Sequence, residues 1–587
     1  MFTDATRGAA EEPVALALAG KIPGVTVIPH RFKLSPLEER FTSRLRLLCD
    51  VLHYEHPDFA DALWLRDRAW EAPPPGVARW ARRIARCGRK CSRWAISAAL
   101  ALDRVVAPPA IFDTFLEAED PDVLLASPVV WGLSAQIELL KAASRRGTPT
   151  GILIPSWDNL TTKGFLGYVP DRVFVWNEMQ RAELERLHRT PAGRVTVTGA
   201  PTFDHWFTAS RVQGREAFLE RVGLDPTQPY VLYLSSSWQI APEEPDFFER
   251  WLGVIRSSPD EVVRDVQVLV RPHPVLHTQA SWYAREFERL PHVSVWPLDA
   301  DALAQPEYYS DYENSLRHCA AAIGLNTSSM VEAAIFAKPV CTWEDGSLGE
   351  RLRQTPHYGH LRTAGGAGLL HVATNAAQHV EQLGQAIRQG VAGMPDPQSL
   401  SFAEAFIRPR GLDHPVAPFM ADELVRLGRE QSRVDVPGPI GRRVGKTVER
   451  SHYLLGLPLQ DHPIRSIMVR LVAEIVFLRA RPKGKAEARR MRAAAEIERQ
   501  KQRARARKDA QKAQKLHAAA ELEQRMHAAA EIERQKREGR EQKEQRRRAA
   551  VEIQEQKQRA RARKDAQKAQ KLRAAAELEQ PELEQPE

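Results

Sequence analysis

The sequence predicts an α/β fold with two Rossmann-like halves that face a cleft, followed by a long charged C-terminal α-helix. Short apolar segments alternate with helical ones twice along the chain, at about residues 122–207 and again at 230–343. Segments of this length between helices are typical of parallel strands covered on both faces. From residue 485 onward the chain is built mainly from Ala, Glu, Lys, Arg and Gln, which are strong helix formers.

The length of 587 residues and a hydrophobic content of 43% are sufficient for more than one domain. Changes of composition divide the chain into four parts. We expect an N-terminal Rossmann-like domain whose first unit is degenerate or missing, a C-terminal Rossmann-like domain, a linker with an amphipathic helix, and a repetitive charged helix or weak coiled coil. Their expected bounds are 1–208, 209–428, 429–484 and 485–587.

The net charge of +9 comes from the C-terminal part of the chain. From residue 483 to the end there are 30 Lys and Arg against 19 Asp and Glu, which leaves 54 against 56 for the preceding residues. The tail mixes acids with its basic runs and carries no aromatic residue, so nucleic acid is not the expected partner.

Cysteine content and hydropathy favour a cytoplasmic protein. Five cysteines in a chain of this length are too few and too scattered for a disulfide framework. Cys87 and Cys91 have no second Cys/His pair near them in sequence, so we expect no metal site there. No signal peptide and no apolar run of about 20 residues is present.

The first half begins with an expected strand at residues 25–28 and a helical region at 36–102, broken at Pro57 and at 73–75. A strand, a glycine turn and a helix normally open such a domain, and none is evident before residue 25. Either the chain begins late or this first unit is degenerate. Strands and helices then alternate, with strands expected at 122–126, 149–154, 172–176 and 194–198, and helices at 134–146 and 178–187.

The second half repeats this pattern after a helix at about residues 215–222. Strands are expected at 230–234, 266–270, 293–296, 320–325 and 340–343, the last of these closing the sheet. Three of these strands run directly into polar segments whose side chains can donate hydrogen bonds to a phosphate. The segments are Ser235 to Ser237, Arg271 to His273, and Asn326 to Ser329.

Ligands gather at the carboxyl ends of strands in open parallel sheets, so we expect these three segments to form one anion-binding site. The helix predicted after Thr327 adds free backbone N–H groups and a positive dipole end to the hydroxyls of Ser328 and Ser329. The alternative is that Thr327 or Ser328 only caps the helix.

Several motifs of the chain resemble those of one enzyme family. They are RPHP at 271–274, GLNTSSMVEAA at 324–334, SWDNLTTKG at 156–164, VPDRVFVWNEMQRAEL at 169–184, VTVTGAPTFDHWF at 195–207 and FIRPRGLD at 406–413. In this order, over about residues 122–428, they resemble GT-B-fold nucleotide-sugar glycosyltransferases and the related glycerophosphotransferases of bacterial capsule and teichoic-acid synthesis.

The resemblance implies that the second half binds the nucleotide diphosphate of the donor. The Arg-Pro-His element would contact the diphosphate or the leaving group, the Ser/Thr turn would hold the phosphates, and the helix glutamate would bind ribose. The implied donor residues are Ser235, Ser236, Ser237, Arg271, His273, Asn326, Thr327, Ser328, Ser329 and Glu332. Arginine, protonated histidine and oriented N–H groups stabilise a departing diphosphate without a metal, and no paired-acid motif occupies a matching place, so we expect no cofactor.

The acceptor side is expected at the loop after the strand at 149–154. This loop brings Asp158, Asn159, Thr161, Thr162 and Lys163 to the cleft. Asp158 could deprotonate an acceptor hydroxyl as a general base, and His273 is the second catalytic candidate. Alternatively, Asp158 and Asn159 form a turn by bonding their own backbone.

Two segments beyond residue 428 predict contacts outside the enzyme body. Residues 463–478 form an apolar helical stretch with flanking basic residues, which would lie on an anionic membrane or dock onto the body. Residues 500–524 recur at 556–580 with a single change, His517 to Arg573. Large apolar residues are rare there, so we expect a solvated single helix, or a weak coiled coil through which the chain self-associates.

Together these features predict a glycosyltransferase that moves a sugar from a nucleotide-diphosphate donor to a hydroxyl of a cell-envelope polysaccharide or glycolipid. One alternative keeps the fold and changes the chemistry, to CDP-glycerol-type glycerophosphate transfer or UDP-sugar 2-epimerisation. Another is a non-catalytic scaffold with a helical tether. The expected partners are a nucleotide sugar and a glycan or lipid-linked acceptor, in the cytoplasm or at the inner face of the membrane.

Overall fold

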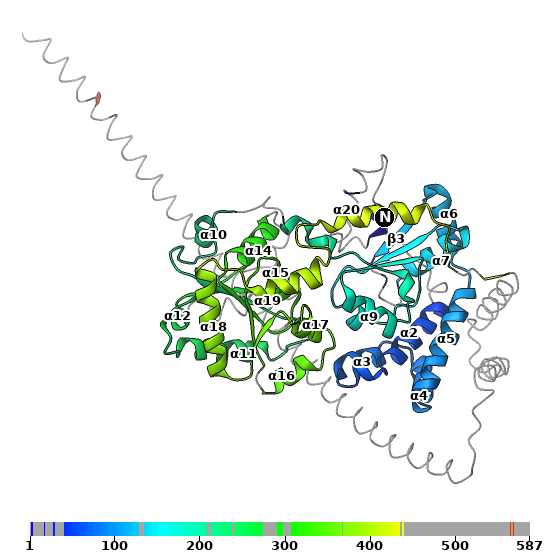
Figure 1. Cartoon of the computed structure of the whole chain (residues 1–587), viewed down its shortest axis with the longest axis horizontal. Coiled ribbons are helices and arrows are strands. Elements are labelled where there is room, and N and C mark those ends of the chain that lie inside the picture. Colours follow the sequence, from blue (N-terminus) through cyan, green and yellow to red (C-terminus); the bar gives the residue numbers. More distant parts are fainter. Residues whose placement is uncertain are drawn as a thin grey trace, which may run out of the picture. The chain divides into compact units, whose positions relative to one another are not determined.

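The computed structural model describes residues 2–3, 14, 17, 28–29, 40–127, 129, 134–207, 213–237, 240–273, 290–297, 307–344, 346–366, 368–434, 437–438, 564 and 567–568. Within these ranges the chain forms two parallel β-sheets with helices around them (Figure 1). The linker helix expected at 463–478 and almost all of the charged helix expected at 485–587 lie outside the described residues.

The first sheet has six parallel strands in the order β2-β1-β3-β4-β5-β6. Its strands are β1 (Phe2–Thr3), β2 (Ile28–Pro29), β3 (Leu124–Ser127), β4 (Thr150–Leu153), β5 (Arg172–Val175) and β6 (Val195–Val197). The short strand β1 pairs with β2 on one side and β3 on the other, so a strand precedes the one expected at 25–28.

The second sheet has six parallel strands in the order β12-β11-β10-β7-β8-β9. Its strands are β7 (Tyr230–Leu234), β8 (Gln267–Arg271), β9 (Val293–Val295), β10 (Ala321–Gly324), β11 (Val340–Trp343) and β12 (Leu370–Ala373). Counted from β7, this is the 3-2-1-4-5-6 order of doubly wound nucleotide-binding folds, in which the chain reverses direction between the first and fourth strands. Here that switch point lies between β7 and β10.

The expectation of two Rossmann-like halves is confirmed at the level of two parallel sheets, but one strand prediction is wrong. The segment 340–343 does not close the second sheet, because β12 pairs in parallel with β11 at its outer side. This edge strand is short, and its central residues His371 and Val372 are only half-buried. A polar residue in such a short segment hides the apolar run by which buried strands are recognised.

The helices around the first sheet confirm the long helical region expected before residue 102 and its breaks near Pro57 and the triple proline. They are α2 (Arg40–His53), α3 (Leu63–Glu71), α4 (Pro75–Arg86), α5 (Arg89–Val105), α6 (Ala110–Glu119), α7 (Gln136–Arg146), α8 (Asn159–Thr162) and α9 (Glu178–Arg186), with the 3-10 helices η1 (Pro57–Phe59), η2 (Ala192–Arg194) and η3 (Pro201–Phe207).

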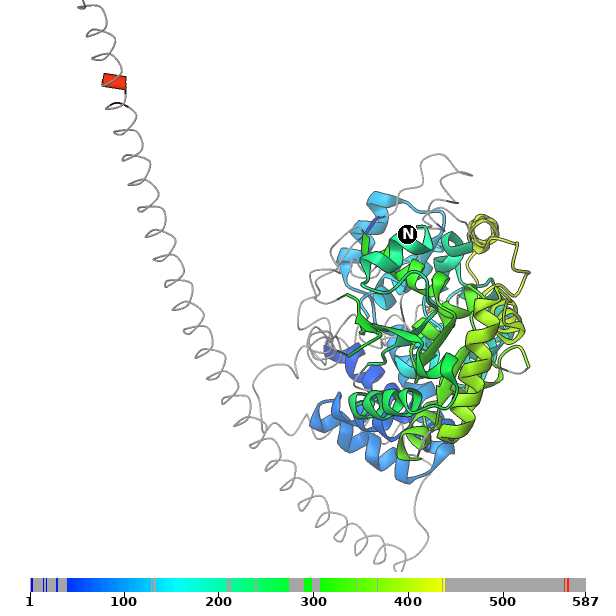
Figure 2. The same cartoon turned by 90° about the vertical axis from the view of Figure 1, so that its left-hand side faces the viewer.

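The helices of the second half lie mostly beside the second sheet (Figure 2). They are α10 (Arg215–Arg221), α11 (Glu244–Arg256), α12 (Glu261–Arg264), α14 (Glu307–His318), α15 (Ser328–Ile335), α16 (Gly346–Arg353), α17 (Tyr358–Thr363), α18 (Ala376–Val391), α19 (Pro397–Phe402), the π-helical turn η5 (Ala403–Ile407) and α20 (Val416–Gly428).

The last of these helices, α20, belongs to the second half by sequence but packs on the first sheet. Ala417, Met420, Leu424 and Leu427 share one buried cluster with three strand residues of that sheet, Leu125, Leu153 and Phe174. Apolar burial of this kind stabilises by about 25 cal/mol per Å² removed from water. The chain therefore returns to its first half after completing the second.

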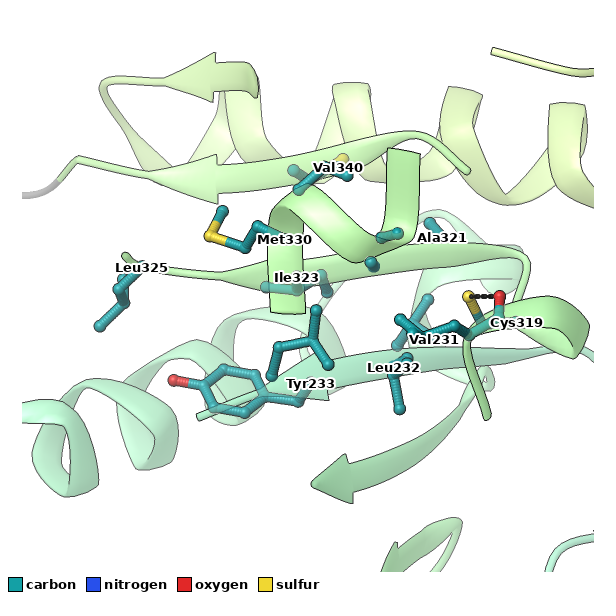
Figure 3. Packing of buried hydrophobic residues seen from close by; sticks show 14 of the residues in the cluster. Val231, Leu232, Tyr233, Cys319, Ala321, Ile323, Leu325, Met330 and Val340 are labelled. Carbon is teal, nitrogen blue, oxygen red and sulfur yellow. Dashed lines mark hydrogen bonds between the residues drawn. The ribbon is translucent and has the colours of Figure 1, made fainter. Parts of the chain in front are cut away.

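The core of the second sheet contains buried apolar residues of its central strands. Val231, Leu232 and Tyr233 of β7 lie beside Ala321 and Ile323 of β10 (Figure 3). Met330 of α15 covers this pair of strands, and its sulfur would lie 3.1 Å from a Cβ added at Gly324. The close approach of α15 to β10 holds the start of this helix at the carboxyl edge of the sheet.

Four buried charged side chains connect helices α2 and α5 to helix α7. Arg46 lies 3.1 Å from Asp103 and also contacts Glu138, and Lys141 lies 3.3 Å from Asp103 and 3.0 Å from Glu138. Burial lowers the pKa of Arg46, but the charges and hydrogen bonds of Glu138 and Asp103 raise it above its ordinary value overall. This group of two cations and two anions neutralises itself inside the protein.

Over the described part of the chain, all five cysteines are free thiols and no cluster of three or more His, Cys, Asp or Glu residues could hold a metal ion. Within the same ranges no single helix combines the length and hydropathy needed to cross a membrane. One bent pair, α5 with α6 at 63°, satisfies both conditions together.

Candidate functional site

The three polar strand ends expected to converge are adjacent in the second sheet. Leu234 at the end of β7 pairs with Arg271 on β8 and with Gly324 on β10. The backbone N–H of Asn326 donates a 3.2 Å hydrogen bond to Ser236 Oγ, which joins the segments after β7 and β10 directly. These segments therefore meet at the switch point of a doubly wound sheet, where such folds bind their ligands.

Arg271 is buried at this edge with only 4% of its surface exposed. Its guanidinium lies over the rings of Tyr308 and Tyr312, at 5.4 and 5.0 Å from their centroids. Burial lowers the pKa of Arg271, and the two tyrosine hydroxyls offset this only in part. Neither terminal nitrogen makes a hydrogen bond of normal geometry to any described residue. The cation is held by ring faces, and its donors are left for another acceptor.

Tyr312 connects this arginine to the start of α15. Its hydroxyl lies 2.7 Å from Ser329 Oγ and contacts Glu332 Oε2. Burial raises the pKa of Glu332 to about 7, and the Tyr312 hydrogen bond works against this rise. One carboxylate oxygen of the predicted ribose-binding glutamate is thus occupied by a neighbouring side chain, which sequence spacing does not indicate.

The N-terminus of α15 is not capped by its own side chains. Thr327 occupies the N-cap position in extended conformation, but its hydroxyl makes no capping hydrogen bond. Ser328 Oγ instead accepts a 2.9 Å hydrogen bond from Trp157 Nε1, a residue of the first half. The alternative that these hydroxyls serve only as helix caps is therefore wrong for the structure as it stands.

Trp157 belongs to the loop after β4, where the acceptor side was expected. In this loop Asp158 Oδ1 accepts a 2.7 Å hydrogen bond from Ser156 Oγ, and Asp158 Oδ2 accepts a 2.8 Å hydrogen bond from Thr162 Oγ1. Burial works to raise the pKa of Asp158, but the charges of His357 and Lys163 and these hydroxyls bring it below its ordinary value. Both carboxylate oxygens hold the loop in shape, mainly through side chains rather than through its own backbone N–H groups.

The remaining predicted acceptor residues are fixed within the same loop. Asn159 and Thr161 are buried, and the Thr161 hydroxyl donates to the Asp158 carbonyl at 3.0 Å. Helices α2 and α3 hold the loop from outside, because the Tyr54 hydroxyl donates to the Thr161 carbonyl at 3.4 Å and Arg68 donates to the Thr162 carbonyl. The helical layer therefore supports the loop that reaches the second sheet.

His357 joins the two sides of the site and was not anticipated from the sequence. Its Nε2 lies 3.1 Å from Asn326 Nδ2, and its ring packs edge-on to Trp157 at 5.1 Å between centroids. Burial lowers the pKa of His357 to about 4, although the nearby charge of Asp158 raises it. The imidazole is therefore neutral at neutral pH, and its Nδ1 has no partner among the described residues.

His360, one turn further along, makes another contact between the halves. Its Nε2 lies 2.6 Å from Glu183 Oε1 on α9, and both side chains are buried. The only sequence signal for His357 and His360 is their spacing of three residues. Histidine pairs with this spacing are more often buried in a core than part of a functional site. The tertiary structure alone places them at this junction.

Glu244 was also missed. It is fully buried at the start of α11, and both of its oxygens accept hydrogen bonds from the Ser236 N–H, at 3.1 and 2.8 Å. The Tyr233 hydroxyl donates to it at 3.2 Å. Burial raises the pKa of Glu244 to about 8, and these hydrogen bonds moderate the rise. This carboxyl fixes the turn of Ser235 to Ser237 at the edge of the sheet.

The raised pKa of Glu244 predicts a dependence of stability on pH. Because the folded pKa lies above the unfolded value of 4.5, the favourable contribution is complete below that value and is lost as pH rises toward 8. The free energy of unfolding should fall by up to about 1.4 kcal/mol per pH unit for this group. We expect Glu244→Gln to flatten the decrease measured by urea unfolding between pH 5 and pH 8.

The matched control is Glu249→Gln, an exposed position on the same helix, which should leave the slope unchanged. Asp50 and Glu332, whose pKa values burial raises to about 7, leave a residual slope of the same sign. An identical slope in the wild type and Glu244→Gln would contradict the protonated state of this carboxyl.

His273, the remaining predicted residue, follows Arg271 and is half-buried. Burial lowers its pKa from the ordinary value, so at neutral pH the ring is neutral. The expectation of a protonated histidine at this position is therefore not supported by its surroundings. A neutral imidazole still offers one N–H donor and one acceptor nitrogen.

Four side chains around the switch point carry buried polar atoms without a hydrogen-bond partner among the described residues. They are Ser235 Oγ, the two terminal nitrogens of Arg271, Asn326 Oδ1 and His357 Nδ1. A buried polar group without a partner costs about 1–3 kcal/mol, so most such groups in proteins are paired. These four side chains could therefore pair with a polar ligand at this edge of the sheet.

No protein-family model matches the chain, and no curated protein sequence matches it. In structure it is similar to the UDP-GlcNAc 2-epimerase of Methanocaldococcus jannaschii, with 12% identity, a TM-score of 0.40, and coverage of 72% of this chain and 98% of that one. It is also similar to the UDP-GlcNAc 2-epimerase of Neisseria meningitidis bound to UDP-GlcNAc, with 12% identity and a TM-score of 0.38. This match covers 72% of this chain and 98% of that one. The match to the wall teichoic acid polymerase TagF has 12% identity and a TM-score of 0.29, and covers 44% of this chain and 58% of that one. At these identities and TM-scores the similarity does not indicate which reaction this chain performs.

Proposed function

We propose that this chain is an enzyme that binds a nucleotide-diphosphate sugar at the carboxyl edge of its second sheet and transfers the sugar to an acceptor hydroxyl. The observation that carries the proposal is Arg271, a buried cation with unpartnered donors beside the switch point and the start of α15. An anionic ligand there would pair the guanidinium and meet the positive end of the helix dipole.

The leaving group of this reaction is the nucleotide diphosphate, and its negative charge determines which residues the reaction needs. Transfer breaks the bond between the anomeric carbon and the diphosphate oxygen, and the nucleotide diphosphate departs with the electron pair. Arg271, the N–H groups at Ser328 and Ser329, and a neutral His273 would stabilise the developing charge. The acceptor oxygen forms the new bond and releases its proton to a base, for which Asp158 is the predicted group.

Asp158 acts in this proposal from the other half of the molecule. Trp157, its neighbour, donates to Ser328 across the junction, so the acceptor loop and the phosphate-binding turn are joined by one hydrogen bond. Because the Asp158 carboxylate is charged and already hydrogen-bonded, it would need to exchange the Ser156 or Thr162 hydroxyl for the acceptor hydroxyl. This exchange replaces one O–H donor with another and requires no new charge.

A donor panel with analysis of the released nucleotide tests the proposal. The full chain is first screened by thermal shift with UDP, GDP, CDP and ADP, since a ligand at 100 times its Kd stabilises by about 2.7 kcal/mol. The matching nucleotide sugars are then incubated with enzyme and followed by mass spectrometry. Glycosyl transfer predicts release of the nucleoside diphosphate together with a glycosylated acceptor.

The alternatives give different products. Glycerophosphate transfer from a CDP-linked donor releases the nucleoside monophosphate, because the bond between the two phosphates breaks. Epimerisation changes the sugar without joining it to an acceptor. Nucleotide binding without turnover of any donor would favour a scaffold, and absence of nucleotide binding would contradict the site itself.

A further inference from the structure

The helical layer of the first half carries a surface that no part of the proposed reaction uses. Residues 72–102 contain seven Lys and Arg and no Asp or Glu, although the chain up to residue 482 carries 54 basic against 56 acidic residues. All seven side chains are exposed, and they form the α4–α5 basic face: Arg79, Arg82, Arg83, Arg86, Arg89, Lys90 and Arg93.

Helices α4 and α5 present this face from a hairpin. Gly88 joins them with a φ of +88°, and both pack on α2 (Figure 1). On α4 the buried side is made by Ala78, Ala81 and Ile84, and on α5 by Ala95, Ile96 and Ala99. With small and apolar residues facing α2, the long basic side chains project away from the protein body.

None of the seven cations has an acidic partner among the residues that the structure describes, whereas several exposed arginines elsewhere in those ranges, such as Arg146, Arg388 and Arg426, pair with a carboxylate. Within the face, Arg79 and Arg83, Arg82 and Arg86, and Arg89 and Arg93 are like charges four residues apart. Each such pair destabilises a helix by about 0.2–0.5 kcal/mol. The repulsion between these cations lowers the stability of the isolated protein, and an anionic surface beside the face would offset it.

The positive potential of this face reaches its neighbours. Burial and the charges of Arg186, Arg89 and Arg93 lower the pKa of His56, and burial together with the charge of Arg93 lowers that of Arg189. Trp94, next to Arg93, is 49% exposed, and the Arg83 guanidinium lies 5.4 Å from the centroid of the Trp80 ring. Tryptophan beside several cations is the composition that membrane interfaces favour.

We propose that the α4–α5 basic face docks this protein onto an anionic lipid bilayer. Each Lys or Arg near such a surface strengthens binding about fivefold, and the Trp94 ring would sit among the headgroups. A single well-exposed aromatic side chain is too few for the successive base stacking by which proteins bind single-stranded nucleic acid. None of the residues of this face belongs to the proposed nucleotide site.

The test uses the full chain and compares two variants of equal charge. The first, Arg79→Gln, Arg86→Gln, Lys90→Gln and Arg93→Gln together, removes four cations from the face. It leaves Arg82 and Arg83 over the Trp70 and Trp80 rings. The control, Arg264→Gln, Arg388→Gln, Arg426→Gln and Arg429→Gln, removes four exposed cations elsewhere. Glutamine is a good helix former, so both variants should fold.

Binding is measured by co-sedimentation with phosphatidylcholine vesicles containing about one third phosphatidylglycerol, at about physiological ionic strength. We expect the face variant to bind about 1,000-fold more weakly than the wild type, and the control to lose less than about threefold. Trp94→Ala should weaken binding about tenfold at unchanged net charge. All chains share the basic tail, so its contribution cancels in the comparison.

Equal losses in the face variant and the control would overturn the proposal, as would undiminished binding in the face variant. A third measurement uses single-stranded poly(U) as the competing polyanion. If the face variant loses affinity for poly(U) while the wild type does not bind the vesicles, the face is a nucleic-acid surface and the membrane proposal is wrong.

Discussion

Arg271→Met is expected to remove most nucleotide-diphosphate binding without lowering the stability of the protein. The wild-type guanidinium is buried and lies over two tyrosine rings, and its terminal nitrogens make no hydrogen bond of normal geometry within the described ranges. Methionine fills a similar space without a charge that needs solvation, and replacing a buried charged group in this way is often neutral or stabilising. A charge-assisted contact to phosphate is lost, which should weaken binding by about 10- to 100-fold.

The measurement is isothermal titration with the nucleotide that gives the largest thermal shift, together with unfolding in the absence of ligand. Arg271→Lys should recover only part of the affinity, because lysine cannot form a bidentate contact. Arg264→Met, an exposed arginine of the same half, is the charge control and should bind normally. Undiminished affinity, or a marked loss of stability without ligand, would show that Arg271 serves the fold and not a ligand.

Arg46→Met is expected to have the opposite consequence, a loss of about 3–5 kcal/mol in the free energy of unfolding. Arg46 is as deeply buried as Arg271, but it is paired with Asp103 and Glu138. Without it, two buried carboxylates share the single cation of Lys141. The same substitution therefore separates a structural arginine from one held for a ligand.

Urea unfolding at neutral pH measures this effect, with Arg44→Met on the exposed side of the same helix as the control. Adding Glu138→Gln to Arg46→Met should recover part of the loss, because Asp103 and Lys141 then remain as a single buried ion pair. An unchanged urea midpoint for Arg46→Met would contradict the prediction. It would mean that the ion pairs of Arg46 do not stabilise the packing of α2 and α5 on α7.

Most strands of the fold could be predicted because they are short apolar runs between turn signals. β7 and β11 have the expected bounds, and several others shift by one or two residues at their ends. β12 was missed because an edge strand need not be apolar throughout. The packing of α20 on the first sheet could not be predicted, because its amphipathic pattern indicates a buried face but does not name the surface that covers it.

The site divides in the same way. The segments at Ser235, Arg271 and Asn326 could be found because each follows a parallel strand, and parallel strands bring their carboxyl ends to one edge. Glu244, Tyr312 and His357 lie on other elements and reach the site only through packing. Their roles follow from burial and hydrogen bonding, which have no regular sequence spacing.

What the sequence by itself determined is local: where strands and helices form, which strand ends carry hydroxyls and cations, and where the basic residues of α4 and α5 are concentrated. These follow from periodicity and residue chemistry over a few neighbouring positions. The tertiary structure alone decided that the terminal nitrogens of the buried Arg271 make no hydrogen bond of normal geometry to a described residue, that Trp157 bridges to Ser328, and that Glu244 takes up a proton near neutral pH. Burial and pairing depend on residues far apart in the chain, and they set the cost of each charge and hence what it is available to bind.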